Sequence, residues 1–160
     1  MTAALGTLVG GDAVRFERLL PGPIDRVWSY LTDSERLPLW FIPGSVAPAV
    51  GGAVSFDMGI SGQVTAYDPP HVLEYTWDEP NRERGPVMDA LVRWELATEG
   101  DQVRLVLLHR RLPTATRPQF GAGWHTLLDR LVANLQEREV PEIGSTFAAL
   151  EPTYETRFAS

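Results

Sequence analysis

Neither cysteine nor lysine occurs in the 160-residue sequence, and all 14 of its basic residues are arginine. Without cysteine the chain can form no disulfide, no thiolate nucleophile and no cysteine-ligated metal site. Without lysine it has no Schiff-base amine, no anchor for pyridoxal phosphate and no phosphate-loop lysine. These absences exclude several large enzyme classes, and the lack of disulfides favours a cytoplasmic location.

Long apolar runs and a basic surface are also missing. No stretch approaches the roughly 18 apolar residues that cross a bilayer, so we expect no membrane insertion. Residues 1–14 are apolar but carry no positive charge, which is untypical of a signal peptide. The formal net charge is −7, and the only adjacent basic residues are Arg110 and Arg111. Because nucleic acids and anionic membranes attract basic surfaces, we expect neither as a partner.

Hydrophobic residues make up 44% of the sequence and charged residues 22%, a composition typical of a globular protein. We expect one domain over residues 1–160, with a core of about 14–139 and a C-terminal extension, 140–160, that packs back onto it. Apolar and polar alternation, interrupted by turn residues, predicts six strands. They lie at residues 14–20, 53–58, 63–67, 72–77, 88–96 and 103–109.

Helical spacing of apolar residues predicts a helix after Pro23, and a second short helix capped by Thr32 or Asp33 that ends at Pro38. The longest helix is predicted over residues 119–138. Residues 145–158 should form short helical turns, because a proline at position 152 prevents one continuous helix.

This order separates a run of strands from the helices, which indicates an α+β fold with an antiparallel meander. The long helix can bury its apolar face only against the concave side of that sheet. Large rings on both sides can leave a gap between helix and sheet, which is our hypothesis for an apolar pocket. The inward-facing sets would be Leu73, Tyr75 and Trp77, then Val92, Trp94 and Leu96, then Val103, Leu105, Leu107 and His109.

Several segments carry a resemblance to a known family: residues 27–33 with Trp40 and Phe41, then 51–52, 62–70, 73–77, 93–96, 105–109 and 123–131. In order and spacing they resemble bacterial members of the family named for homology to the activator of the heat-shock-protein-90 ATPase. That family lies within the superfamily of steroid-transfer and birch-pollen-allergen-like domains. The resemblance covers about Val14 to Phe158. It implies a helix-grip fold, a curved antiparallel sheet around a long C-terminal helix with two short helices after the first strand. It also implies a cavity for a hydrophobic ligand beneath that helix, but no common reaction.

The candidate ligand-binding residues are the large side chains assigned to the interior. They are Trp40, Phe41, Phe56, Tyr75, Trp77, Trp94, Leu107, His109, Phe120, Trp124 and Leu128. Tryptophan offers a large apolar area and one donor to a flat ligand, but each ring could equally fill the core. His109 could donate a hydrogen bond to a ligand or act as a base, or it could be a buried histidine bonded to backbone. Trp28 is expected in the core.

Chemistry beyond binding has little support in the sequence. His125 and Asp129, four residues apart on the long helix, share a face and could hold a metal, but no third ligand is identifiable. Glu74, Arg93 and Glu95 should form ion pairs on the solvent face of the sheet. Serine-elbow, zinc-protease and dinucleotide-binding motifs are absent. We therefore expect no metal, no cofactor and no catalytic residue.

Three functions follow. The leading hypothesis is a domain that binds a small hydrophobic molecule or lipid between sheet and helix. The first alternative is a protein-interaction domain, co-chaperone-like or homodimeric, acting through the outward-facing Val106 and Leu108 and the apolar C-terminal tail; a chaperone partner rests on the resemblance alone. The second is a cavity enzyme of cyclase, hydrolase or dehydratase type that uses His109 or Tyr75.

Overall fold

The computed structural model describes residues 4–159. Within them, eight strands form one antiparallel sheet in the order β1-β2-β8-β7-β6-β5-β4-β3. The strands are β1 (Thr7–Val9), β2 (Ala13–Pro21), β3 (Gly44–Val46), β4 (Ala53–Phe56), β5 (Ile60–Asp68), β6 (Val72–Glu79), β7 (Val87–Glu99) and β8 (Gln102–Arg110). The helices are α1 (Ile24–Thr32), α2 (Leu37–Trp40), α3 (Arg117–Leu135) and α4 (Ile143–Arg157), and a 3₁₀ turn, η1 (Thr114–Thr116), precedes α3.

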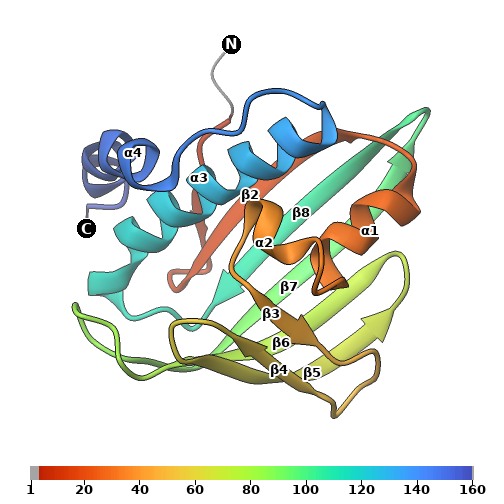
Figure 1. Cartoon of the computed structure of the whole chain (residues 1–160). Helices are drawn as coiled ribbons and strands as arrows, with labels where there is room; N and C mark the ends of the chain where they lie inside the picture. The colour runs from red at the N-terminus through yellow and green to blue at the C-terminus, as the bar shows by residue number, and fades with distance from the viewer. Residues whose placement is uncertain (1–3, 160) are drawn as a thin grey trace.

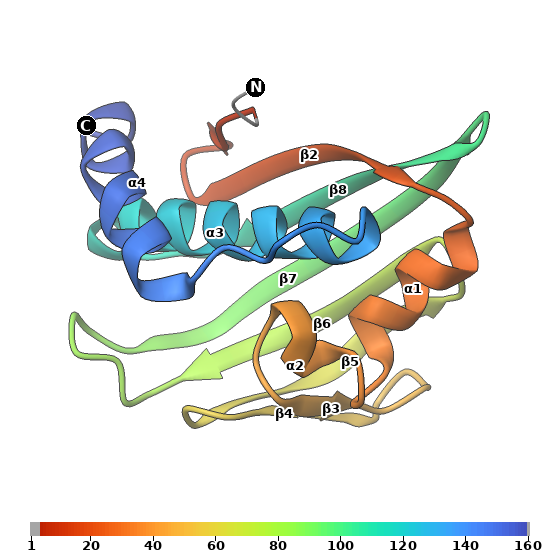
Figure 2. The ribbon, with the colours of Figure 1, turned by 45° about the horizontal axis from the view of Figure 1, so that its top comes forward.

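The sheet curves around α3, which lies across its concave side (Figure 1). Turned by 45°, the same sheet runs from β2 on one side of the molecule to β3 and β4 on the other, with α1 and α2 packed against its inner surface (Figure 2). The α+β class, the antiparallel meander and the helix-grip arrangement are confirmed. No helix of residues 4–159 is both long enough and apolar enough to cross a bilayer.

Alternation of side chains determines which face of each central strand is buried. Along β6, Leu73, Tyr75 and Trp77 are buried between half-buried neighbours, as the sequence pattern predicts. On the opposite face, Arg93 forms ion pairs with Glu74 at 3.2 Å and with Glu95 at 2.7 Å, so the predicted solvent-face pairs are confirmed.

Two edge strands escape prediction because each has only three residues. All three residues of β1 are exposed and follow no apolar alternation, and the turn after it places Gly10 and Gly11 at positive φ. β3 begins at Gly44, where an added Cβ would lie 2.8 Å from the Cα of Phe56 in β4. Only glycine allows that approach of the two strands.

The prediction that Pro38 ends the second helix is wrong. Pro38 lies in the first turn of α2, which continues to Trp40. Proline suits this position because the first N–H groups of a helix have no intrahelical acceptor. The indole of Trp40 then donates to the carbonyl of Tyr30 in α1 over 2.8 Å, which fixes the two short helices together.

The prediction that Pro152 breaks the C-terminal segment is also wrong. α4 is one continuous helix with Pro152 inside it. Proline removes the hydrogen bond to the carbonyl of Ala148, but both residues are exposed, so water can satisfy that carbonyl. Tyr154 and Phe158, both buried against α3, provide packing that offsets the cost.

The long helix is buried more widely than one amphipathic face requires. α3 runs from Arg117 to Leu135, so it starts two residues before and ends three residues before the predicted bounds. Phe120, Trp124 and Leu128 pack toward the sheet, whereas the face with Gly121 contacts Tyr154 and Phe158 of the α4 segment. Because α4 buries this second face, apolar residues of α3 are not confined to one side of the helix.

Candidate functional site

An open cleft of about 600 Å³ lies at one end of the interior, where several parts of the chain meet. These are the first half of α3, α4, the residues after α2, the β4–β5 turn, and the end of β6 with the loop that follows it. Its apolar lining includes Phe41, Ile60, Trp77, Phe120, Trp124 and Phe147. Its polar rim consists of Glu79, Asn81, Arg82, Glu83, Arg84, Gln119 and Glu151.

Four of the residues predicted from the sequence line this cleft: Phe41, Trp77, Phe120 and Trp124. The other seven are buried without lining it. They are Trp40, Phe56, Tyr75, Trp94, Leu107, His109 and Leu128. Their part in ligand binding stays a prediction, and in the structure they form the packed layer behind the cleft.

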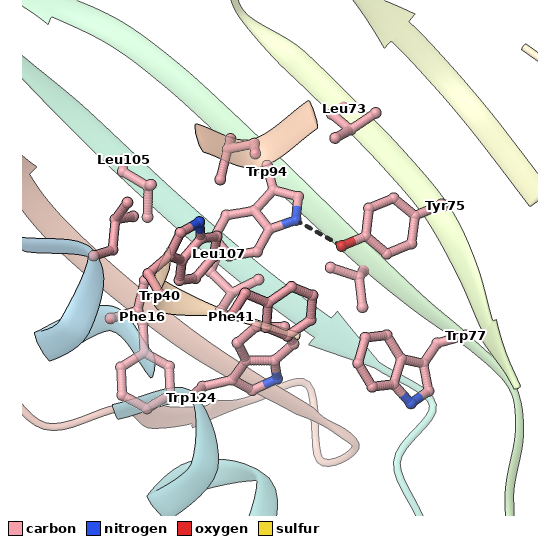
Figure 3. Close-up of a cluster of buried hydrophobic side chains, with 14 of the residues drawn as sticks. Phe16, Trp40, Phe41, Leu73, Tyr75, Trp77, Trp94, Leu105, Leu107 and Trp124 are labelled. Carbon is pink, nitrogen blue, oxygen red and sulfur yellow. Dashed lines mark hydrogen bonds between the residues drawn. The ribbon is translucent and has the colours of Figure 1, made fainter. Parts of the chain in front are cut away.

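Rings of that layer pack against the rings that line the cleft (Figure 3). Trp94 donates from its indole nitrogen to the hydroxyl of Tyr75 over 3.1 Å. Phe41 stacks on Trp124 with ring centroids 5.4 Å apart and on Trp40 at 5.2 Å. Burial raises the pKa of the Tyr75 phenol, so this hydroxyl stays protonated. Its contact with Trp94 joins two rings of the packed interior. Trp28, which the sequence placed in the core, is half-buried, with its ring edge-on to Tyr67 at 5.7 Å.

His109 lies at the inner end of the aromatic floor and is fully buried. Its Nδ1 accepts a hydrogen bond from the indole of Trp124 over 2.9 Å, and its Nε2 has no partner in the described part of the chain. Burial, aided by the positive charge of Arg82, lowers the pKa of His109 to about 3. The ring is therefore neutral at physiological pH.

Glu79 and Arg82 hold the rim in place. The carboxylate of Glu79, 9% exposed, accepts from the indole of Trp77 over 3.0 Å and lies 3.5 Å from the guanidinium of Arg82. Arg82 also covers the ring of Phe120 at 4.5 Å and donates to Gln119 over 3.0 Å. Burial raises the pKa of Glu79, although the Trp77 hydrogen bond and the Arg82 charge oppose the shift.

The β6–β7 loop and α4 meet across the mouth of the cleft. Arg84 of the loop lies 3.1 Å from Glu151 of α4, and Phe147, one turn earlier on α4, lines the cleft beside it. These loop and α4 residues were missed in the sequence because they follow no alternation and lie in segments assigned to turns. Their only signal was the excess of charged residues at positions 79–84.

A second polar cluster lies on the other side of α3, outside the cleft. The Nδ1 atom of His125 is 2.8 Å from the hydroxyl of Tyr154, which accepts from the backbone N–H of Gly6 over 2.8 Å. Nε2 of His125 is 3.6 Å from Asp129, so this pair shares a face as predicted. Between residues 4 and 159, no three potential metal-ligating side chains gather. The cluster instead joins α3, α4 and the N-terminal segment.

Comparison with known proteins gives consistent results. The crystal structure of CalU16 from Micromonospora echinospora has a TM-score of 0.77 and 25% identity, over 92% of this chain and 89% of that one. The solution structure of the protein encoded by gene BPP1335 from Bordetella parapertussis has a TM-score of 0.75 and 29% identity, over 98% of this chain and 93% of that one. PFC0360w, an HSP90 activator from Plasmodium falciparum, shares the fold, with a TM-score of 0.54 and 22% identity over 64% of this chain and 75% of that one.

The sequence matches no curated protein. Residues 21–136 match the family described as "Activator of Hsp90 ATPase homolog 1-like protein". This match covers most of the chain, from the end of β2 to the end of α3. The chain therefore belongs to the family of activator of Hsp90 ATPase homolog 1-like proteins.

Proposed function

We propose that this protein binds a small hydrophobic molecule in the cleft between the sheet, α3 and α4. The observation that carries the proposal is the lining of the cleft, about 600 Å³ in volume and floored by the rings of Phe41, Trp77, Phe120 and Trp124. Small-molecule sites are typically concave, of roughly 300–1,000 Å³, mostly apolar and supplied with a few polar groups. The family fold, which suggests ligand binding, supports the same function.

The two tryptophans of the floor are held in place before any ligand arrives. Trp77 is held by Glu79 and Trp124 by His109, each through its single indole N–H. A ring that is already fixed loses little conformational freedom on binding, so more of the contact energy appears as affinity. The four rings therefore suit a flat apolar molecule.

Native mass spectrometry of the purified protein, followed by denaturation and identification of released molecules, tests this proposal. The matched variants are Gly123→Leu and Gly123→Ala. Gly123 lines the cleft, and a Cβ added there meets only Phe147, at 4.0 Å. Leucine should fill the cleft and abolish occupancy, whereas alanine should keep most of it. Equal occupancy in wild type and Gly123→Leu would show that the molecule binds elsewhere, and failure of wild type to take up any apolar molecule, fluorene included, would refute binding.

A cavity enzyme is a second candidate, and one group favours it. Glu79 is nearly buried at the cleft and its pKa is raised, as expected of a carboxyl that exchanges protons with a ligand. Its two existing contacts, to Trp77 and Arg82, also explain its position without chemistry. If the released molecule has a different mass from the molecule supplied, and Glu79→Gln abolishes that change, the enzyme function holds.

Protein interaction is a third candidate, favoured by a shallow groove of about 220 Å³ on the outer face of the sheet. Val9, Val106 and Leu108 line it, between Arg15, Arg93, Glu95 and Arg110. A homodimer or a co-purifying protein in the native mass spectrum, lost in Leu108→Arg, would support this function.

A further inference from the structure

His109 is separated from the cleft by a single layer of rings. Its ring centroid lies 4.7 Å from that of Phe120, 5.2 Å from that of Trp77 and 5.8 Å from that of Trp124. All three of these rings line the cleft. The histidine has no exposed surface of its own, so a ligand reaches it only where one of the three rings turns aside.

The hydrogen-bond partner at Nδ1 determines where the imidazole proton resides. An indole N–H only donates, so Nδ1 of His109 must accept from Trp124 and carries no proton. The ring is neutral, because burial strongly disfavours its charged form. In a neutral imidazole the single proton then lies on Nε2, which makes Nε2 a hydrogen-bond donor.

This donor is unsatisfied. Nε2 is inaccessible to solvent and has no acceptor among residues 4–159. Buried polar groups in folded proteins are almost always paired, and an orphan indicates a functional role or a missing partner. A partner for Nε2 must supply an acceptor atom at the inner end of an apolar, ring-lined space.

The charges at the cleft argue against an anionic ligand. Three carboxylates and two guanidiniums line it: Glu79, Glu83 and Glu151 against Arg82 and Arg84. Both arginines are already paired, Arg82 with Glu79 and Arg84 with Glu151. An anionic head group would therefore find no free cation and would face excess negative charge.

We propose that the cleft takes an uncharged, flat aromatic molecule with a carbonyl oxygen, and that Nε2 of His109 donates a hydrogen bond to that oxygen. The inference rests on the proposed binding function and adds the chemical class of the ligand. Phe120 is the ring that moves: it is the nearest to His109, lies in the first turn of α3 and is 8% exposed. Contact with the rings of Trp77 and Trp124, which both line the cleft, accounts for the flat aromatic part.

The probes are 9-fluorenone and fluorene, two flat tricyclic molecules that differ in one position, C=O against CH₂. Quenching of tryptophan fluorescence measures the affinity of each. Wild type should bind fluorenone about tenfold more tightly than fluorene, which corresponds to one net hydrogen bond. Equal affinity for the two would overturn the role of His109 while leaving the binding function intact. Binding of neither would overturn the binding function itself.

Two variants distinguish the roles of the two ring nitrogens of His109. In His109→Asn the amide oxygen can replace Nδ1 as acceptor for Trp124, but the inner donor is lost. In His109→Gln the amide nitrogen lies near the position of Nε2, so the donor is kept. The preference for fluorenone should disappear in His109→Asn and persist in His109→Gln; the reverse pattern would overturn the assignment.

A measurement on wild type keeps the test decisive if either variant fails to fold. The chain has three histidines, so nitrogen-15 spectra of the imidazoles are simple to assign. The Nε2–H resonance of His109 should move on addition of fluorenone and stay unchanged with fluorene. Tighter binding of oleate than of fluorenone would overturn the uncharged class and indicate a lipid carboxylate instead.

Discussion

The indole N–H of Trp124 donates to Nδ1 of His109 over 2.9 Å, and this contact joins the middle of α3 to the end of β8. Through it, one hydrogen bond orients a ring of the cleft floor and sets the protonation of the histidine behind it. The helix, the sheet and the cleft floor thus meet at a single buried pair. Burial of His109 in this contact also predicts that the stability of the protein depends on pH.

The free energy of unfolding should decrease as the pH is lowered, because of His109. Its pKa is about 3 in the folded protein but ~6.5 in the unfolded chain, so only the unfolded chain takes up the proton as pH falls below that value. The contribution of His109 to the free energy of unfolding is fully present above pH ~6.5. It is lost as the pH falls toward 3, by up to about 1.4 kcal/mol per pH unit. His125, whose pKa is also lowered by burial, acts in the same direction.

Denaturant titrations between pH 7 and 4 measure this slope, and His109→Gln should reduce it while His125 remains. Nitrogen-15 chemical shifts provide the direct check. A His109 ring that titrates near pH 6.5 in the folded protein would contradict the prediction.

Two neighbouring glycines of α3 should respond oppositely to alanine. A Cβ at Gly121 would lie 2.6 Å from Tyr154 and 2.8 Å from Phe158, whereas one at Gly123 meets only Phe147, at 4.0 Å. We expect Gly121→Ala to lower the free energy of unfolding by about 1–3 kcal/mol through overpacking. Gly123→Ala should raise it by about 1 kcal/mol, because alanine is the better helix former. Thermal or chemical denaturation compares the two, and equal effects would show that α4 does not pack on Gly121.

Tyr154→Phe should loosen α4. The hydroxyl accepts from the N–H of Gly6 and bonds Nδ1 of His125, each over 2.8 Å, so its removal leaves two buried groups unpaired. We expect a loss of about 1–3 kcal/mol in the free energy of unfolding, with faster amide hydrogen exchange in α4. Tyr67→Phe is the control, since the described residues include no hydrogen-bond partner for that hydroxyl. An unchanged stability of Tyr154→Phe would mean that water replaces the hydroxyl.

Arg18 is a buried cation with few hydrogen-bond partners. It is 7% exposed, and its Nε and Nη2 atoms have no partner within residues 4–159; only Nη1 donates, to the carbonyl of Glu17 over 2.8 Å. Because an unpaired buried charge is costly, Arg18→Met should leave stability unchanged or raise it by about 1 kcal/mol. The guanidinium carbon of Arg18 lies 5.4 Å from the centroid of the Phe16 ring. Arg18→Ala, which also removes the apolar stem of the side chain, should be less stable than Arg18→Met. Breaking a buried ion pair is strongly destabilising. If Arg18→Met lowers the free energy of unfolding by more than about 2 kcal/mol, Arg18 has an acceptor that stabilises the fold.

The sequence by itself determined the class of fold and much of the interior. Strict alternation along β6 and β8 identified the buried face, because a period of two leaves only one way to point Tyr75 and Leu107 inward. The apolar spacing of Trp124 and Leu128 placed α3 against that face. Missing cysteine and lysine excluded whole kinds of chemistry without any structure.

Only the tertiary structure decided where the cleft lies. Its rim joins Arg84 to Glu151, and Trp124 of its lining bonds His109 in the layer behind it; both pairs join different elements. It also overrode local preference at Pro152, whose helix is held by the packing of Tyr154 beside Gly121. Local patterns specify which side of a segment is apolar, but not which distant segment covers it. The covering segment is determined by how apolar surfaces are buried in the folded chain. In this protein that packing leaves four rings facing an open cleft.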